Sequence, residues 1–73
     1  VYKCEGQGLV ETEIYVDQQG NVISARVIAE KSTTADECLF DAAVKYALRS
    51  KFNADPTAPP RQKGKIWYQF IAQ

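Results

Sequence analysis

The sequence predicts an α+β domain in which two strands, one helix and a third strand follow one another along the chain. Apolar residues alternate with a period of two in residues 9–29, recur at helical spacing in residues 35–51, and alternate again in residues 65–72. A helix that crosses from the second strand to the third leaves the first strand in the middle of the sheet. We therefore expect a β-β-α-β two-layer sandwich: a three-stranded antiparallel-type sheet in the order 2-1-3, with one helix packed on one face.

The first two strands are predicted to form a hairpin. Residues 9–17 read as a strand, residues 17–21 as a turn in which Gly20 suits a positive φ angle, and residues 22–29 as the returning strand. The buried face of the first strand is expected to carry Val10, Thr12, Ile14 and Val16.

The hydrophobic pattern also predicts the register of this hairpin. Pairing Asp17 with Val22 places the small and branched side chains of both strands on one core face and sets Glu13 across from Arg26 on the other. A slip by one residue would bring Arg26 onto the core face, so we expect the first register. Its core-face pairs are Val16 with Ile23, Ile14 with Ala25, Thr12 with Val27, and Val10 with Ala29.

Residues 35–51 are predicted to form the helix. Thr34 followed three residues later by Glu37 matches a capping box, which predicts Thr34 as the N-cap. Phe52 is expected to close the end of the helix against the core. The apolar stripe of the helix comprises Ala35, Cys38, Leu39, Ala42, Ala43, Tyr46 and Ala47.

The last strand is predicted to follow a proline-containing surface loop. Residues 53–64 hold all three prolines, and residues 65–72 alternate between the two sheet faces. This strand would lie at the sheet edge, and it is long, aromatic and carries one charge, on Lys65. An edge of this kind is a candidate for strand addition by a partner peptide, for pairing between two copies of the chain, or for cover by the tail of the chain. In this last strand, the core-facing residues are Ile66, Tyr68, Phe70 and Ala72, and the outward residues are Lys65, Trp67, Gln69 and Ile71.

The two cysteines are predicted to form a disulfide. Cys4 precedes the first strand and Cys38 lies one turn inside the helix, so both fall at the same end of the sheet. Two buried reduced thiols are the alternative. A disulfide would indicate an oxidising compartment.

Four large side chains are expected on the sheet face that the helix leaves uncovered. They suggest either a partner surface or a face covered by the proline-containing loop or the N-terminal tail. Glu11 and Glu13 share that face, and we interpret them as a solvated strand surface rather than a catalytic pair. The four residues are Leu9, Tyr15, Trp67 and Ile71.

Composition argues against several functional classes. Nine basic and nine acidic residues give zero net charge, which does not favour a nucleic-acid partner. The chain has no histidine and only two cysteines, so we expect no metal, no cofactor and no enzyme activity. It also has no methionine, which predicts that these 73 residues form a single domain cut from a longer protein.

Five segments covering about residues 6–72 together resemble the C-terminal domain of TonB-type energy transducers, in a Bacteroidetes-like version. Their order and spacing carry the resemblance. They are Gly8-Leu-Val-Glu-Thr-Glu-Ile-Tyr-Val16, Asp17-x-x-Gly20-Asn-Val22, Asp41-Ala-Ala43, Lys51-Phe52 and Gly64-Lys-Ile66-x-Tyr68-x-Phe70.

The resemblance implies a periplasmic, non-catalytic domain that is anchored to the inner membrane, and linked to motor proteins there, through a segment outside this chain. Such domains pair their last strand with the plug segment of an outer-membrane TonB-dependent transporter and transmit force for substrate uptake. The partner-binding residues that the resemblance implies are Lys65, Ile66, Trp67, Tyr68, Gln69, Phe70 and Ile71.

Related TolA-like domains have no transporter partner. The alternative expectation is therefore a structural or homodimerising cell-envelope domain, which would associate with itself through the face of Trp67 and Tyr15.

Overall fold

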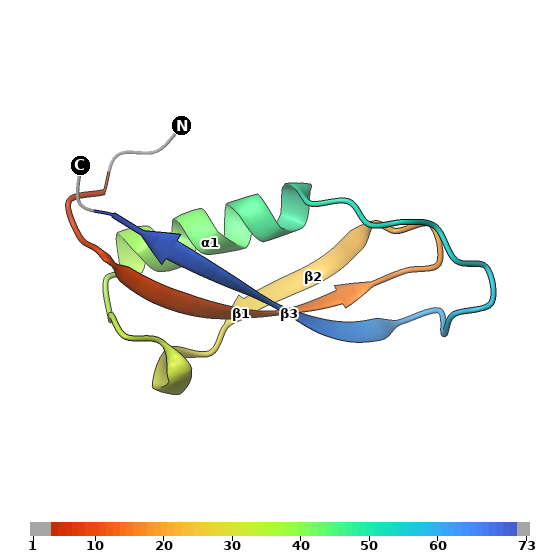
Figure 1. Cartoon of the computed structure of the whole chain (residues 1–73), viewed down its shortest axis with the longest axis horizontal. Helices are drawn as coiled ribbons and strands as arrows, with labels where there is room; N and C mark the ends of the chain where they lie inside the picture. The colour runs from red at the N-terminus through yellow and green to blue at the C-terminus, as the bar shows by residue number, and fades with distance from the viewer. Residues whose placement is uncertain (1–3, 72–73) are drawn as a thin grey trace.

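The computed structural model describes residues 4–71, and its elements follow the predicted order (Figure 1). They are β1 (Gly8–Val16), β2 (Val22–Val27), the short 3₁₀ helix η1 (Ala29–Lys31), α1 (Glu37–Arg49) and β3 (Gln62–Phe70).

β1 is the central strand of the sheet. It pairs antiparallel with both of the other strands, so the order is β2-β1-β3. α1 packs against one face of this sheet, and residues 4–71 contain no second α-helix that could cover the other face (Figure 1). The predicted α+β class, the strand order and the single covering helix are therefore confirmed.

The predicted register is confirmed in the middle of the hairpin. The observed pairs there are Thr12 with Val27, Glu13 with Arg26, and Ile14 with Ala25. It is wrong at the turn, where the register shifts between Tyr15 and Val16, so that Val16 lies opposite Val22. Ile23 becomes the extra residue of a bulge, and it is 50% exposed instead of facing the core.

The predicted pairing of Val10 with Ala29 is also wrong, because the chain leaves the strand after Val27 and turns into η1. Residues further along take over the hydrogen bonds to β1. The Thr33 N–H donates to the Leu9 carbonyl at 2.8 Å, and Ser32 Oγ accepts from the Glu11 N–H at 3.1 Å.

The core lies between α1 and the sheet. Three buried alanines of α1, at positions 42, 43 and 47, allow the helix backbone to approach the strands closely. The predicted core tyrosines, Tyr46 and Tyr68, are half-buried against this core, with ring centroids 6.1 Å apart. The central cluster consists of Cys4, Val10, Leu39, Ala42, Ala43 and Phe70.

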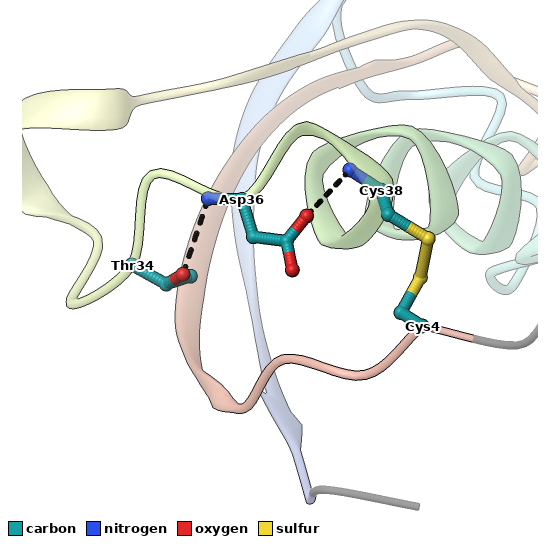
Figure 2. Close-up of a disulfide and its surroundings, with 4 residues drawn as sticks. All are labelled: Cys4, Thr34, Asp36 and Cys38. Atoms are coloured by element: carbon teal, nitrogen blue, oxygen red, sulfur yellow. Dashed lines mark hydrogen bonds between the residues drawn. A yellow bond between two sulfur atoms is a disulfide. The ribbon is translucent and has the colours of Figure 1, made fainter.

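The start of α1 differs from the predicted capping box. The N-cap is Asp36, whose Oδ1 accepts a hydrogen bond from the Cys38 N–H at 2.9 Å (Figure 2). Thr34 Oγ1 instead accepts from the Asp36 N–H at 3.2 Å, so Thr34 shapes the turn that leads into the cap. The helix ends at Arg49, about two residues before the predicted end.

The predicted disulfide between Cys4 and Cys38 is present, with 5.8 Å between the two Cα atoms (Figure 2). It fastens the segment before β1 to the first turn of α1. Cys4 is buried in the core cluster.

The loop after α1 is fastened to the turn between β1 and β2 (Figure 1). Gly20 has φ of 87°, and a Cβ atom there would collide with the Phe52 carbonyl oxygen. The Phe52 N–H donates to the Gly20 carbonyl at 2.9 Å, and the Asp55 N–H donates to the Gln18 carbonyl at 2.9 Å. The Phe52 side chain is 46% exposed, so the prediction that it closes the helix end against the core is wrong.

β3 begins at Gln62, three residues before the predicted start. The strand is longer because β1 extends to Val16. Lys63 pairs with Tyr15, and Gln62 pairs with Val16. Ala72, the predicted end of the strand, lies outside the described residues.

Candidate functional site

The outer edge of β3 is the first part of the candidate site. β3 is a nine-residue strand that pairs with β1 on one side. Within residues 4–71, no further strand pairs with its other side. Which of its backbone groups face outward follows from the hydrogen bonds of β1.

The odd-numbered residues of β1 direct their backbone groups toward β2 and the segment that follows it. The Glu11 carbonyl accepts from the Ile28 N–H at 2.9 Å, and the Leu9 N–H donates to Thr33 Oγ1 at 2.7 Å. Because these groups alternate in direction along an antiparallel strand, the even-numbered residues of β1 bond to β3.

The same alternation runs through β3. Its even-numbered residues, such as Gly64 opposite Ile14, direct their backbone groups to β1. The N–H and C=O groups of the odd-numbered residues therefore point away from the sheet, as a row of donors and acceptors that another strand can use. These residues are Lys63, Lys65, Trp67 and Gln69.

The side chains of these odd-numbered residues lie on the face opposite α1, which we call the open face. Lys63 Nζ is 3.1 Å from Glu13 Oε2, and Lys65 Nζ is 3.4 Å from Glu11 Oε2. From β2, Arg26 Nε donates to Glu13 Oε1 at 2.9 Å. Cations from both edge strands thus converge on the two carboxylates of the central strand.

Glu11 and Glu13 are not the solvated pair that the sequence predicted, because they are only 2% and 7% exposed. The long side chains of the neighbouring strands cover them and supply the opposite charge. The hydrogen bond from Arg26, followed by that from Lys63, lowers the pKa of the Glu13 carboxyl below its ordinary value of 4.5. Glu13 in turn raises the pKa of Arg26.

The four large side chains expected on the open face differ in their exposure. Trp67 is 52% exposed and Ile71 is 72% exposed, whereas Leu9 and Tyr15 are half-buried. The Arg61 guanidinium lies 4.1 Å from the centre of the Tyr15 ring, so the loop covers that side chain in part. The open face is therefore a mixed, cation-rich surface with one exposed tryptophan.

A pocket of about 240 Å³ lies on the opposite side of the sheet, where the loop after α1 passes over the strands. Side chains of β1 and the loop supply its apolar part, and β3 contributes four consecutive residues. Its lining comprises Ile14, Val16, Asp17, Phe52, Asn53, Asp55, Ala58, Gln62, Lys63, Gly64 and Lys65.

The seven predicted partner-binding residues divide into two groups. Lys65, Trp67 and Gln69 direct backbone groups outward and side chains onto the open face, and Ile71 follows the end of β3. The other three have backbone groups paired with β1 and side chains on the helix face, where they are half-buried or buried. These are Ile66, Tyr68 and Phe70.

Sequence reasoning missed three residues of the site, namely Arg61, Lys63 and Gly64. Arg61 and Lys63 continue the odd-numbered alternation of the last strand toward the N-terminal side, and this signal could have identified them. The prolines at positions 59 and 60 outweighed it in the prediction of the loop.

The described part of the chain contains neither a candidate metal site nor a candidate membrane-spanning helix. Residues 4–71 contain no group of three or more side chains that could hold a metal ion. The same residues include no helix with the length and apolar character needed to cross a membrane.

A scan of protein-family models, a search of curated proteins and a search of solved structures each found no match to this chain.

Proposed function

We propose that this chain is the periplasmic, non-catalytic interaction domain of a TonB-like energy transducer. In this proposal, its β3 edge binds the plug segment of an outer-membrane transporter by strand addition. Force from inner-membrane motor proteins would reach the pair through a segment outside this chain. The observation that carries the proposal is the row of outward backbone groups along β3 between Lys63 and Gln69.

The strand geometry fits this role. A peptide added at β3 would extend the antiparallel sheet from three strands to four, with main-chain hydrogen bonds supplying affinity. The outward side chains of Lys65, Trp67 and Gln69 would supply selectivity on the open face. The disulfide supports an oxidising compartment such as the periplasm.

The test removes one outward N–H group without breaking the β1–β3 ladder. Gln69→Pro deletes an N–H that points away from β1, and proline also restricts the preceding residue to extended conformations, which β3 already has. We expect it to weaken binding of transporter plug-segment peptides by about tenfold or more, because it removes a hydrogen bond and puts a ring at the edge.

Gln69→Ala is the matched control, because it removes the same side chain but keeps the N–H group. Titration of the isotope-labelled domain, followed by backbone amide shifts, should localise binding to residues 62–70 in both the wild type and Gln69→Ala. Unchanged affinity of a folded Gln69→Pro variant would refute strand addition.

One further outcome would favour the structural, homodimerising domain. In that case no plug-segment peptide binds, and sedimentation shows concentration-dependent self-association that weakens when Trp67 or Tyr15 is replaced. A domain that stays monomeric would count against this alternative.

A further inference from the structure

Gly64 leaves a gap in the side-chain row of β3. It pairs with Ile14 of β1, and the neighbouring position on the same face, Ile66, carries a large side chain. A Cβ atom built on Gly64 would lie 3.5 Å from Ile14, which is ordinary van der Waals contact, so the space above Gly64 can accept a side chain. This space belongs to the 240 Å³ pocket under Phe52 and Ala58.

The pocket reaches the outer edge of the sheet. Lys63 and Lys65 line it, although their side chains lie on the open face, where they pair with Glu13 and Glu11. It is therefore the backbone of these two lysines that borders the pocket. That backbone is the part of β3 that an added strand would contact.

An antiparallel strand added at β3 would place one of its side chains over Gly64. Directly opposed residues point to the same face of a sheet, and Gly64 uses its own backbone groups for β1. Gly64 and its new partner would therefore form a non-hydrogen-bonded pair, the type whose side chains approach most closely. An aromatic side chain across from an edge glycine packs over it and compensates for its missing side chain.

The size of the pocket suits one aromatic ring. A cavity of about 150 Å³ is large enough to bind benzene, whereas sites for whole small molecules are about 300–1,000 Å³. The pocket beside Gly64, at 240 Å³, lies between these sizes. Its apolar lining by Ile14, Val16, Phe52 and Ala58 favours an apolar occupant.

The charges near β3 indicate which residues of the partner strand are favoured on either side of the aromatic residue. The neighbours of the aromatic residue would lie opposite Lys63 and Lys65, with their side chains on the open face. Residues 59–73 contain three cations and no acidic residue, although the whole chain has zero net charge. The open face carries four cations and the two carboxylates Glu11 and Glu13. The cations are Arg26, Arg61, Lys63 and Lys65.

A second copy of the chain fits this edge poorly in the register that is centred on Gly64. Antiparallel pairing of two β3 strands centred on Gly64 would set Lys63 of one copy opposite Lys65 of the other, and like charges directly opposed destabilise a sheet. In an acidic partner strand, the side chains opposite Lys63 and Lys65 carry a negative charge, and opposite charges directly opposed stabilise a sheet.

We propose that β3 selects a partner strand containing an acidic–aromatic–acidic tripeptide, with the aromatic ring seated over Gly64 in the pocket and the acidic side chains facing Lys63 and Lys65. This inference rests on strand addition at β3 and specifies the partner that it accepts.

The test uses three capped nonapeptides. The first is Thr-Val-Thr-Glu-Phe-Glu-Thr-Val-Thr, the second has Ala in place of Phe, and the third has Lys in place of both Glu residues. We expect the first to bind at Gly64 and the flanking lysines. The Ala peptide should bind at least about tenfold more weakly, because it buries no ring. The Lys peptide should lose affinity as well, and the advantage of Glu should shrink in high salt.

A variant of the domain tests the pocket directly. Gly64→Leu fills the pocket, so it should weaken the Phe peptide about tenfold and leave the Ala peptide within about twofold. Gly64→Ala fills less of the pocket and should give an intermediate loss; it provides the same test if Gly64→Leu does not fold.

The inference fails if the Phe and Ala peptides bind equally, if Gly64→Leu weakens both alike, or if none of the three peptides binds. Strand addition itself is judged separately. If transporter segments still bind the wild type and lose binding in Gln69→Pro, the proposed function stands and only the tripeptide preference is refuted.

Discussion

Glu13 links all three strands of the sheet on the open face. Its carboxylate accepts from Arg26 of β2 at 2.9 Å and lies 3.1 Å from Lys63 of β3. Because Glu13 is only 7% exposed, these two cations replace contacts that water would otherwise make with its carboxylate, and removing either leaves part of it without a partner. Glu13 therefore connects side chains of β2 and β3 across the central strand.

The lowered pKa of Glu13 predicts how stability depends on pH. A carboxyl group whose pKa is lower in the folded state contributes stability that is fully present above its unfolded pKa, near 4.5, and is lost as the pH falls through the folded value. We expect Glu13→Gln to lower the Tm at pH 7 and to flatten the decline of Tm below pH 4.5. Thermal unfolding between pH 2.5 and 7 measures both effects.

Glu5→Gln is the control for this experiment, because Glu5 is exposed. It should reproduce the wild-type curve. A Glu13→Gln variant whose Tm falls with pH as steeply as that of the wild type would contradict the assigned role.

At the scale of the elements, the cap of α1 has a measurable role. Asp36 Oδ1 accepts from the Cys38 N–H at 2.9 Å, in the turn that carries the disulfide (Figure 2). Asp36→Ala should cost about 1 kcal/mol of unfolding free energy, which corresponds to a Tm decrease of roughly 4–8 °C in a domain of this size. Chemical denaturation and thermal unfolding both report this loss.

Asp36→Asn is the matched variant, since asparagine caps about as well as aspartate. It should stay close to the wild type. The cap assignment would be wrong if Asp36→Ala were as stable as wild type, or if Thr34→Ala were the more damaging change.

The boundaries of the elements could be predicted only in part from the sequence. Thr34 and Asp36 are both good N-caps, and local pattern cannot choose between them. Ser32 and Thr33 decide the matter, because their hydrogen bonds to β1 keep the chain out of the helix until Asp36. The start of β3 is likewise a tertiary effect, since Gln62 joins the sheet only because β1 extends to Val16.

The candidate site could likewise be predicted only in part from the sequence. Alternation along the last strand correctly placed Lys65, Trp67 and Gln69 on the face away from the helix, because period two follows from backbone geometry alone. The burial of Glu11 and Glu13 could not be foreseen in this way. It depends on which long side chains of β2 and β3 lie over them, and therefore on a register that includes residues assigned to a loop.

At the scale of the whole molecule, the fold is flat and its core is small. The molecule measures 41 × 25 × 14 Å, and three of the eight apolar residues that are buried within residues 4–71 are alanines. A sheet with one covering helix has little apolar volume to exclude from water, and a chain of this length gains only a marginal stability from its core alone.

The disulfide should therefore contribute a large share of the stability. Cys4 and Cys38 are 34 residues apart, and closing a loop of this length stabilises a protein by roughly 3–4 kcal/mol in the chain-entropy model. A domain of 73 residues has a total of about 4–11 kcal/mol. Replacing both cysteines by serine should thus lower the Tm by about 12 °C or more, as measured by thermal unfolding.

Reduction of the wild-type domain provides a second measurement of the same quantity. A phosphine reductant should lower the wild-type Tm toward that of the Cys4→Ser/Cys38→Ser variant and leave the variant itself unchanged. If reduction shifted the wild-type Tm by only a few degrees, the packing of α1 on β1 and β2 would suffice to hold the fold. The β3 edge would then keep its geometry in a reducing compartment as well, and the disulfide would give less support to the proposed periplasmic location.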